Sequence, residues 1–228
     1  MRAVVWQHEE NEGPALLEKP LRDAGYTLVT RFRAPKHEDV EAELIVVMGG
    51  AMSVTALDAH PFLRDEQGVL AERLALDKPV LGICLGAQLL ASAAGATVTR
   101  GKNGFEVGVA PVRWTKQGLE DAAARGMPAK QTFAHWHEDT WSPVPGATLL
   151  ASTDRYTQQG FKLGRSYGLQ FHPELTAELF GSWLSAEAEL LAADGKDGEE
   201  LRASLPKLKA AEPHNLAFLE QLVRALRS

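Results

Sequence analysis

The stretch Pro79-Val80-Leu81-Gly82-Ile83-Cys84-Leu85-Gly86 carries the strongest structural signal in the chain. Residues 79–83 are an apolar run typical of a strand covered on both faces, and residues 85–94 favour a helix closed by Gly95. A tight turn between them would hold Cys84 in a strained conformation, and the flanking glycines remove Cβ atoms that would clash there. The helix N-terminus then favours the thiolate form of the cysteine. A lone buried cysteine is usually only a small hydrophobe, but the paired glycines favour a nucleophile.

The same alternation of strand and helix extends back to the N-terminus. Strands are expected at residues 2–6, 26–32, 44–48 and 79–83, and helices at 15–24, 61–76 and 85–94. Strands that alternate with helices form right-handed βαβ units. We therefore predict an α/β fold with a doubly wound, mostly parallel sheet.

The pattern changes beyond residue 96. Three strand-like segments (97–114, 131–136 and 147–170), broken by Gly and Pro turns, predict antiparallel strands appended to the parallel core. The tail is expected to be helical at 175–191 and 213–227, with a polar linker at 193–198. We expect one domain over residues 1–192, with a helical C-terminal extension, 193–228, packed on it.

Composition narrows the function classes. The net charge of −6 argues against a nucleic-acid partner, and 45% hydrophobic residues suffice for a sizeable core. A single cysteine excludes an intrachain disulfide and fits a reducing compartment. We find neither a signal-peptide pattern nor an apolar run of about 20 residues, so we expect a cytoplasmic protein without membrane association.

A base for the cysteine is expected at Phe171-His172-Pro173-Glu174, directly after a strand-like segment. Residues two apart on extended chain point the same way, so Glu174 would orient the imidazole of His172. His172 would then take the thiol proton and later protonate a leaving amine. Alone, Pro173-Glu174 is equally typical of an ordinary helix start.

The pair Gly49-Gly50 follows the third expected strand. One backbone N–H there, together with that of Leu85, would form an oxyanion hole. Taken alone, two glycines more often mark an ordinary turn.

Three segments together resemble the signatures of class I glutamine amidotransferases. They are Gly49-Gly50-Ala51-Met52-Ser53-Val54, Gly82-Ile83-Cys84-Leu85-Gly86-Ala87-Gln88 and Phe171-His172-Pro173-Glu174, in the order and spacing of that family. The resemblance covers residues 2–184 and is closest to stand-alone members similar to the amidotransferase domain of GMP synthase. It implies a flavodoxin-like sheet.

The resemblance also implies a reaction. Cys84 would attack the side-chain amide of glutamine, ammonia would leave, and water would hydrolyse a γ-glutamyl thioester. Gly50 and Leu85 would supply the oxyanion N–H groups, and Gln88 would contact the substrate. No cofactor and no metal are implied. His135 and His137 are two residues apart, but we expect a substrate-side wall or a plain strand there rather than a metal pair.

Two departures from the family pattern bear on the substrate. Ala51 replaces a proline of the oxyanion loop, and Glu138 replaces a glycine that helps to hold the substrate in relatives. The added bulk and charge of Glu138 keep open a γ-glutamyl peptide hydrolase with the same triad. A non-catalytic binding module of the same fold is a third alternative, which the intact triad disfavours. No synthetase segment is recognisable, so the ammonia would go to a separate synthetase chain or to solution. The sequence leaves a homo-oligomer open.

Overall fold

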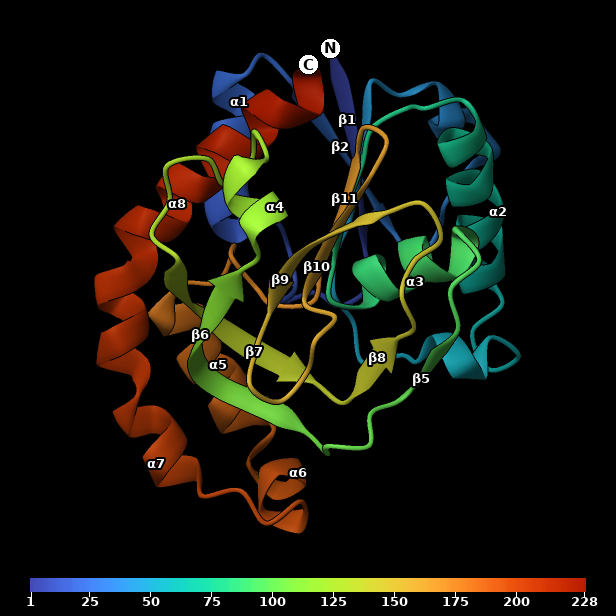
Figure 1. The fold of residues 1–228 in the computed structure, drawn as a ribbon. Coiled ribbons are helices and arrows are strands. Elements are labelled where there is room, and N and C mark those ends of the chain that lie inside the picture. The colour runs from blue at the N-terminus through green and yellow to red at the C-terminus, as the bar shows by residue number, and fades with distance from the viewer.

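The computed structural model describes all residues, 1–228, and is built on a nine-stranded sheet (Figure 1). Five strands run parallel in the order β2 (Thr27–Phe32), β1 (Arg2–Gln7), β3 (Leu44–Val47), β4 (Val80–Ile83) and β11 (Ser166–Leu169). Four antiparallel strands continue the sheet: β10 (Gly160–Leu163), β9 (Thr148–Ser152), β6 (Glu106–Trp114) and β7 (Lys130–His137). The parallel order matches the flavodoxin-like arrangement, so the predicted fold class is confirmed.

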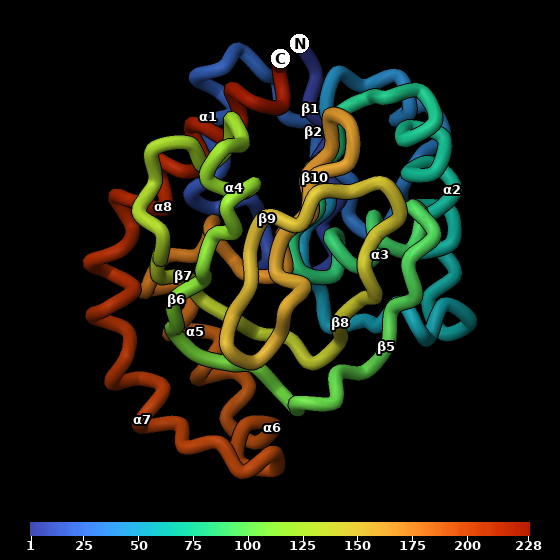
Figure 2. Tube along the Cα trace, viewed as in Figure 1, coloured from blue at the N-terminus to red at the C-terminus, as the bar shows by residue number.

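Helices cover both faces of the parallel part of the sheet (Figures 1 and 2). The helices α1 (Glu18–Asp23) and α8 (Leu205–Arg227) lie on one side, and α2 (Phe62–Ala75) and α3 (Leu85–Ala93) lie on the other. Alternate residues of β1 enter the two cores: Ala3 and Val5 join one, and Val4 and Trp6 join the other. This double burial explains why the strands are continuous apolar runs.

The middle of the chain differs from expectation in two places. The last strand-like segment was expected among the antiparallel additions, but β11 pairs in parallel with β4 and completes the parallel core. Two short strands, β5 (Val98–Arg100) and β8 (Asp139–Trp141), form a separate ladder. A short helix, α4 (Lys116–Glu120), follows β6.

The C-terminal helices begin and end elsewhere than expected. The helix expected at 175–191 is divided into α5 (Ala177–Ala186) and α6 (Ala188–Ala193), and a further helix, α7 (Gly198–Ala203), begins at the end of the expected polar linker. The last helix was expected to begin at Pro213, which is wrong because α8 begins at Leu205. Pro213 is exposed, so the backbone hydrogen bond that it removes lies on the solvent side of the helix. Leu208, which precedes Pro213 in the same helix, is buried and anchors the earlier turns. The helix α8 packs against α1, α5 and β7. No helix combines the length and the apolar character needed to cross a bilayer.

The turn between β4 and α3 has the strained geometry that the sequence predicts. Cys84 has φ 51° and ψ −110°, an unfavourable backbone conformation for a residue with a side chain. A Cβ on Gly82 would overlap the carbonyl oxygen of Gly86, and a Cβ on Gly86 would overlap that of Val47. Both glycines are therefore required, because these neighbours are backbone atoms that cannot move aside.

Replacing Gly86 tests how tightly this turn is packed. We expect Gly86→Ala to lower the free energy of unfolding by about 2 kcal/mol or more, because the new methyl group overlaps the backbone of β3. The matched control is Gly68→Ala on the exposed side of α2, where a Cβ meets no atom within 4 Å. This change should raise stability by about 0.5–1 kcal/mol. Urea unfolding of the three proteins measures both effects, and equal stabilities would contradict the packing described.

Candidate active site

Neighbouring parallel strands bring Cys84 and His172 together. Ile83 of β4 pairs with Leu169 of β11, so the chain segments that follow both strands leave the same edge of the sheet. The backbone N–H of Cys84 donates to the carbonyl of Leu169 (2.8 Å). A Cβ built on Gly49 would lie 3.3 Å from Cε1 of His172 and 3.6 Å from Cβ of Cys84. The two side chains therefore flank the same small space beside Gly49.

Glu174 lies behind the imidazole of His172. Its Oε1 is 2.8 Å from Nδ1 of His172, and both side chains are almost fully buried. The ring of Trp183 stands edge-on to that of His172 at 5.3 Å. The other ring nitrogen, Nε2, makes no hydrogen bond within the protein. Glu174 thus fixes the imidazole and leaves Nε2 free to act.

The charge state of His172 follows from its neighbours. Burial alone would lower the pKa of His172, but the Glu174 carboxylate and the Cys84 sulfur together raise this pKa well above its ordinary value. These two neighbours therefore favour the protonated form of His172 over the neutral form.

Gly50 and Leu85 line the same cavity as Cys84. Leu85 is the first residue of α3, where helical N–H groups lack intrahelical acceptors. The N–H of Gly50 donates no hydrogen bond within the protein. A Cβ on Gly50 would lie 2.8 Å from Cβ of His8 and 3.0 Å from Cδ2 of Leu85, so this loop is closely packed and needs glycine.

His8 holds the Gly49–Gly50 peptide, a contact that the sequence analysis missed. Its Nδ1–H donates to the carbonyl of Gly49 (2.8 Å), and its Nε2 lies 3.0 Å from a carboxylate oxygen of Glu66. Both side chains are buried. Burial lowers the pKa of His8, but the hydrogen bond and charge of Glu66 outweigh it, so the pKa is raised. The sequence did contain a sign of this contact. Glu66 is an acidic residue on the apolar stripe of α2, between Leu63 and Leu70, and a buried acid needs a partner.

Glu12 is a further acidic group near this site that sequence reasoning missed. Its Oε2 would lie 2.5 Å from a Cβ on Gly49, on the same side as His172. Burial raises the pKa of Glu12 to about 7, against the opposing effect of the nearby His172. The Glu12 carboxyl is consequently half-ionised near neutral pH.

One cavity of about 650 Å³ joins the predicted site residues. It is lined by Gly50, Cys84, Leu85, Gln88 and His172, whereas Glu174 lies outside its lining. Cys84 is only 7% exposed, so the sulfur is reached through this cavity.

The remaining wall of the cavity continues away from Cys84. The amide nitrogen of Gln88 donates to Oε1 of Gln170 (3.1 Å). Residues of the α5–α6 segment, among them Trp183 and Leu190, form the far part of the wall.

Glu138 lies at the edge of this cavity, but its charge is not isolated. Its Oε1 lies 2.6 Å from Nη2 of Arg100, which also lines the cavity. The carboxylate expected to disturb the substrate site is therefore part of an ion pair. An ion pair presents both a positive and a negative group to a ligand.

Comparisons with known proteins identify the family of the chain. The sequence model of the class I glutamine amidotransferases matches residues 15–188. The chain is 32% identical over 206 residues to the glutamine amidotransferase-like protein YfeJ of Salmonella typhimurium, covering 86% of this chain and 85% of YfeJ. It is 30% identical over 178 residues to a glutamine-hydrolysing GMP synthase subunit from Haloarcula marismortui, covering 75% and 87% of the two chains.

A solved structure extends the likeness over the whole chain. The crystal structure of a glutamine amidotransferase from Thermotoga maritima superposes with a TM-score of 0.86 at 30% identity, covering 100% of this chain and 99% of the other. The chain belongs to the class I glutamine amidotransferase family. It spans 25% and 30% of the length of two glutamine-hydrolysing GMP synthases that it also matches.

Proposed function

We propose that the protein hydrolyses the side-chain amide of glutamine, or of a related γ-glutamyl compound, through a thioester on Cys84. The observation that carries this proposal is the position of Cys84. It lies at the N-terminus of α3, on the wall of a cavity that it shares with a His172 side chain fixed by Glu174. A nucleophile, an acid–base group and a residue that orients it are the parts that covalent amide hydrolysis requires.

The first half of the reaction makes the thioester. The sulfur of Cys84 attacks the amide carbon, and the electron pair of the C=O bond moves onto oxygen. The N–H groups of Gly50 and Leu85 stabilise this oxyanion. The tetrahedral intermediate then collapses, the C–N bond breaks, and His172 protonates the departing nitrogen so that it leaves as ammonia.

The second half releases the acid. His172, now neutral, takes a proton from water, and the resulting hydroxide attacks the thioester carbon. A second tetrahedral intermediate forms in the same oxyanion site. Its collapse breaks the C–S bond, releases the γ-carboxylic acid, whose proton passes to the ammonia, and regenerates the sulfur of Cys84 beside a protonated His172.

The ion pair of Arg100 and Glu138 supports a glutamyl substrate. Free glutamine carries an α-carboxylate, which is opposite in charge to Arg100, and an α-ammonium group, which is opposite in charge to Glu138. Because Arg100 is 75% exposed, each contact would contribute about 1 kcal/mol or less. Such contacts orient the substrate more than they tighten its binding.

The size of the cavity favours a second candidate, a γ-glutamyl peptide or similar larger amide. A volume of about 650 Å³ lies in the range of sites for drug-sized ligands. The cavity also extends past Cys84 as far as Ala193 and Asp194 at the end of α6. A free amino acid would leave much of this space unfilled.

The acceptor of the ammonia is a separate question. The Haloarcula relative is named as one subunit of a synthase, and we propose that this chain likewise serves a separate synthetase chain. The lone Cys84, needed here as a free thiol, favours the reducing cytoplasm as the place of action.

Removing the nucleophile tests the proposed reaction. Purified parent and Cys84→Ala proteins would be offered glutamine and a panel of γ-glutamyl peptides, with ammonia, released amine and glutamate measured. We expect Cys84→Ala to lose turnover of every substrate by several orders of magnitude, because no covalent intermediate can form. The larger kcat/KM of the parent protein, on glutamine or on a peptide, identifies the substrate class. Turnover by Cys84→Ala near the parent rate would contradict the mechanism.

A pair of substitutions tests whether His8 positions the oxyanion hole. In a trans peptide the C=O and the following N–H point in opposite directions, so holding the Gly49 carbonyl directs the Gly50 N–H. Asparagine can place a donor near the position of Nδ1, whereas glutamine places one near Nε2. We expect His8→Gln to lower kcat by about tenfold to a hundredfold with KM nearly unchanged, and His8→Asn to lose much less.

Steady-state kinetics of the two His8 variants, with Tm values to follow folding, decide the outcome. The two proteins lose opposite contacts of the same side chain, so each is the control for the other. Equal losses in both variants, or a loss confined to KM, would contradict a role of His8 in directing the Gly50 N–H.

A further inference from the structure

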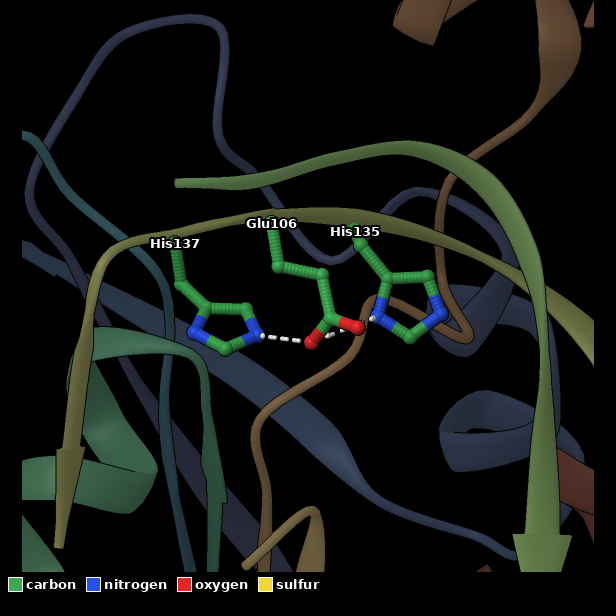
Figure 3. Close-up of side chains that lie close together, drawn as sticks. All are labelled: Glu106, His135 and His137. Carbon is green, nitrogen blue, oxygen red and sulfur yellow. Dashed lines mark hydrogen bonds and ion pairs between the residues drawn. The ribbon is translucent and has the colours of Figure 1, made fainter. Parts of the chain in front are cut away.

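A second cluster of polar side chains adjoins the cavity, which His137 lines, at a place where the sequence had suggested no metal. Glu106 of β6 pairs directly with His137 of β7, and His135 lies two residues before His137 on the same face of the sheet. Figure 3 shows both imidazoles turned toward the Glu106 carboxylate. All three side chains are buried, and one ligand atom from each lies within 4.8 Å of the others.

Backbone carbonyls fix the outer nitrogen of each ring. Nδ1 of His137 lies 3.1 Å from the carbonyl of Asp139, and Nε2 of His135 lies 3.3 Å from the carbonyl of Ala110. A carbonyl only accepts, so both of these ring nitrogens carry hydrogen. In the neutral rings, the inner nitrogens then present lone pairs toward Glu106. Metal-binding histidines are oriented in this way by their outer N–H.

The inner nitrogens face one carboxylate oxygen. Oε2 of Glu106 lies 2.8 Å from Nε2 of His137 and 3.9 Å from Nδ1 of His135. The fully buried Nδ1 of His135 has no hydrogen-bond partner in the protein. A proton on His137 would satisfy that pair alone and leave His135 unsatisfied, whereas one cation would satisfy all three groups.

Gln159 supplies a fourth group at the same point. Its Nε2 lies 2.5 Å from Oε2 of Glu106 and 3.4 Å from Nε2 of His137, while its Oε1 has no partner. The two ends of an amide have nearly the same shape, so a half-turn places the carbonyl oxygen toward the cluster. Thr153 donates to the other oxygen of Glu106 (2.8 Å) and orients the carboxylate.

We propose that Glu106, His135, His137 and Gln159 bind a divalent zinc ion. Imidazole nitrogens and a carboxylate oxygen are all zinc ligands, and the carbonyl oxygen of Gln159 would complete a closed tetrahedral set around the ion. Metal–ligand bonds of about 2.0–2.2 Å require ligand atoms about 3.3–3.5 Å apart. The 2.8 Å and 3.9 Å separations bracket this value, so each must change by about half an ångström.

The ion would fasten the strand that supports the catalytic groups. On β7, the carbonyl of Ala134 accepts from the backbone N–H of His172 (2.9 Å), and the carbonyl of Trp136 lies 3.6 Å from the sulfur of Cys84. The zinc ligands His135 and His137 alternate with these two residues. Binding of zinc does not depend on the proposed reaction, and its test needs no activity assay.

Metal content tests the proposal directly. The purified protein would be freed of metal with a chelator, loaded with Zn²⁺ or Co²⁺, dialysed and measured by elemental analysis. We expect about one ion per chain, an increase in Tm on loading, and visible absorption from tetrahedral Co²⁺. His135→Leu should lose the ion.

Two controls exclude other zinc sites. His37→Leu changes an exposed histidine, and Cys84→Ala removes the other group able to bind zinc near His172, so both should keep the ion and the cobalt spectrum. The proposal fails if the parent protein retains no stoichiometric metal and its Tm does not respond to zinc. It also fails if Cys84→Ala abolishes binding. Either result would leave the cluster as a hydrogen-bonded network only. The metal content and the Tm response of the parent protein test the proposal even if His135→Leu does not fold.

Discussion

The contact between the start of α3 and the end of β3 constrains everything else in the site. Gly86 lies so close to the carbonyl of Val47 that no side chain fits between them. Because α3 begins so close to β3, the chain turns from strand to helix at a single residue, Cys84. The backbone of Cys84 has φ 51° at this turn. The strain is retained because the packed sheet on both sides overdetermines it. The same contact places the N-terminus of α3 beside the loop that follows β3, so Cys84, Leu85 and Gly50 share one edge of the sheet.

Several ionisable side chains gather around that turn. The thiol side of the cavity faces His172, His172 is held by Glu174, and Glu12 lies on the same side. Charges interact more strongly in a buried site than in water. The effect of Glu174 and Cys84 on the pKa of His172 therefore exceeds the effect of burial, and this pKa is raised. The proposed oxyanion site would rely on backbone N–H groups, one of which follows the Gly49 carbonyl held by His8. The proposed nucleophile, acid and oxyanion site thus follow three different strands of one sheet, β4, β11 and β3.

The parts that the sequence predicts well are those determined locally. Gly82, Cys84 and Gly86 lie within five residues, and their geometry follows from steric limits on one turn. The contacts that were missed join distant segments: His8 and Glu66 are 58 residues apart, and pairing of this kind leaves no periodic signal. The start of α8 was misplaced because Pro213 is typical of a first helical turn, whereas here it faces solvent within the helix. Glu138 looked like an isolated charge because its partner, Arg100, lies 38 residues away.

The central claim is that Cys84 is the covalent nucleophile for a γ-glutamyl carbon. The most direct measurement is covalent labelling by a glutamine analogue whose side-chain amide is replaced by an electrophilic chloroketone, followed by peptide mass mapping. Because the chain has a single cysteine, a label found on cysteine can only be on Cys84. The account predicts one label per chain, on Cys84, formed in step with loss of activity and slowed by the true substrate. Inactivation with the label on another residue, or an active protein that stays unlabelled, would contradict it.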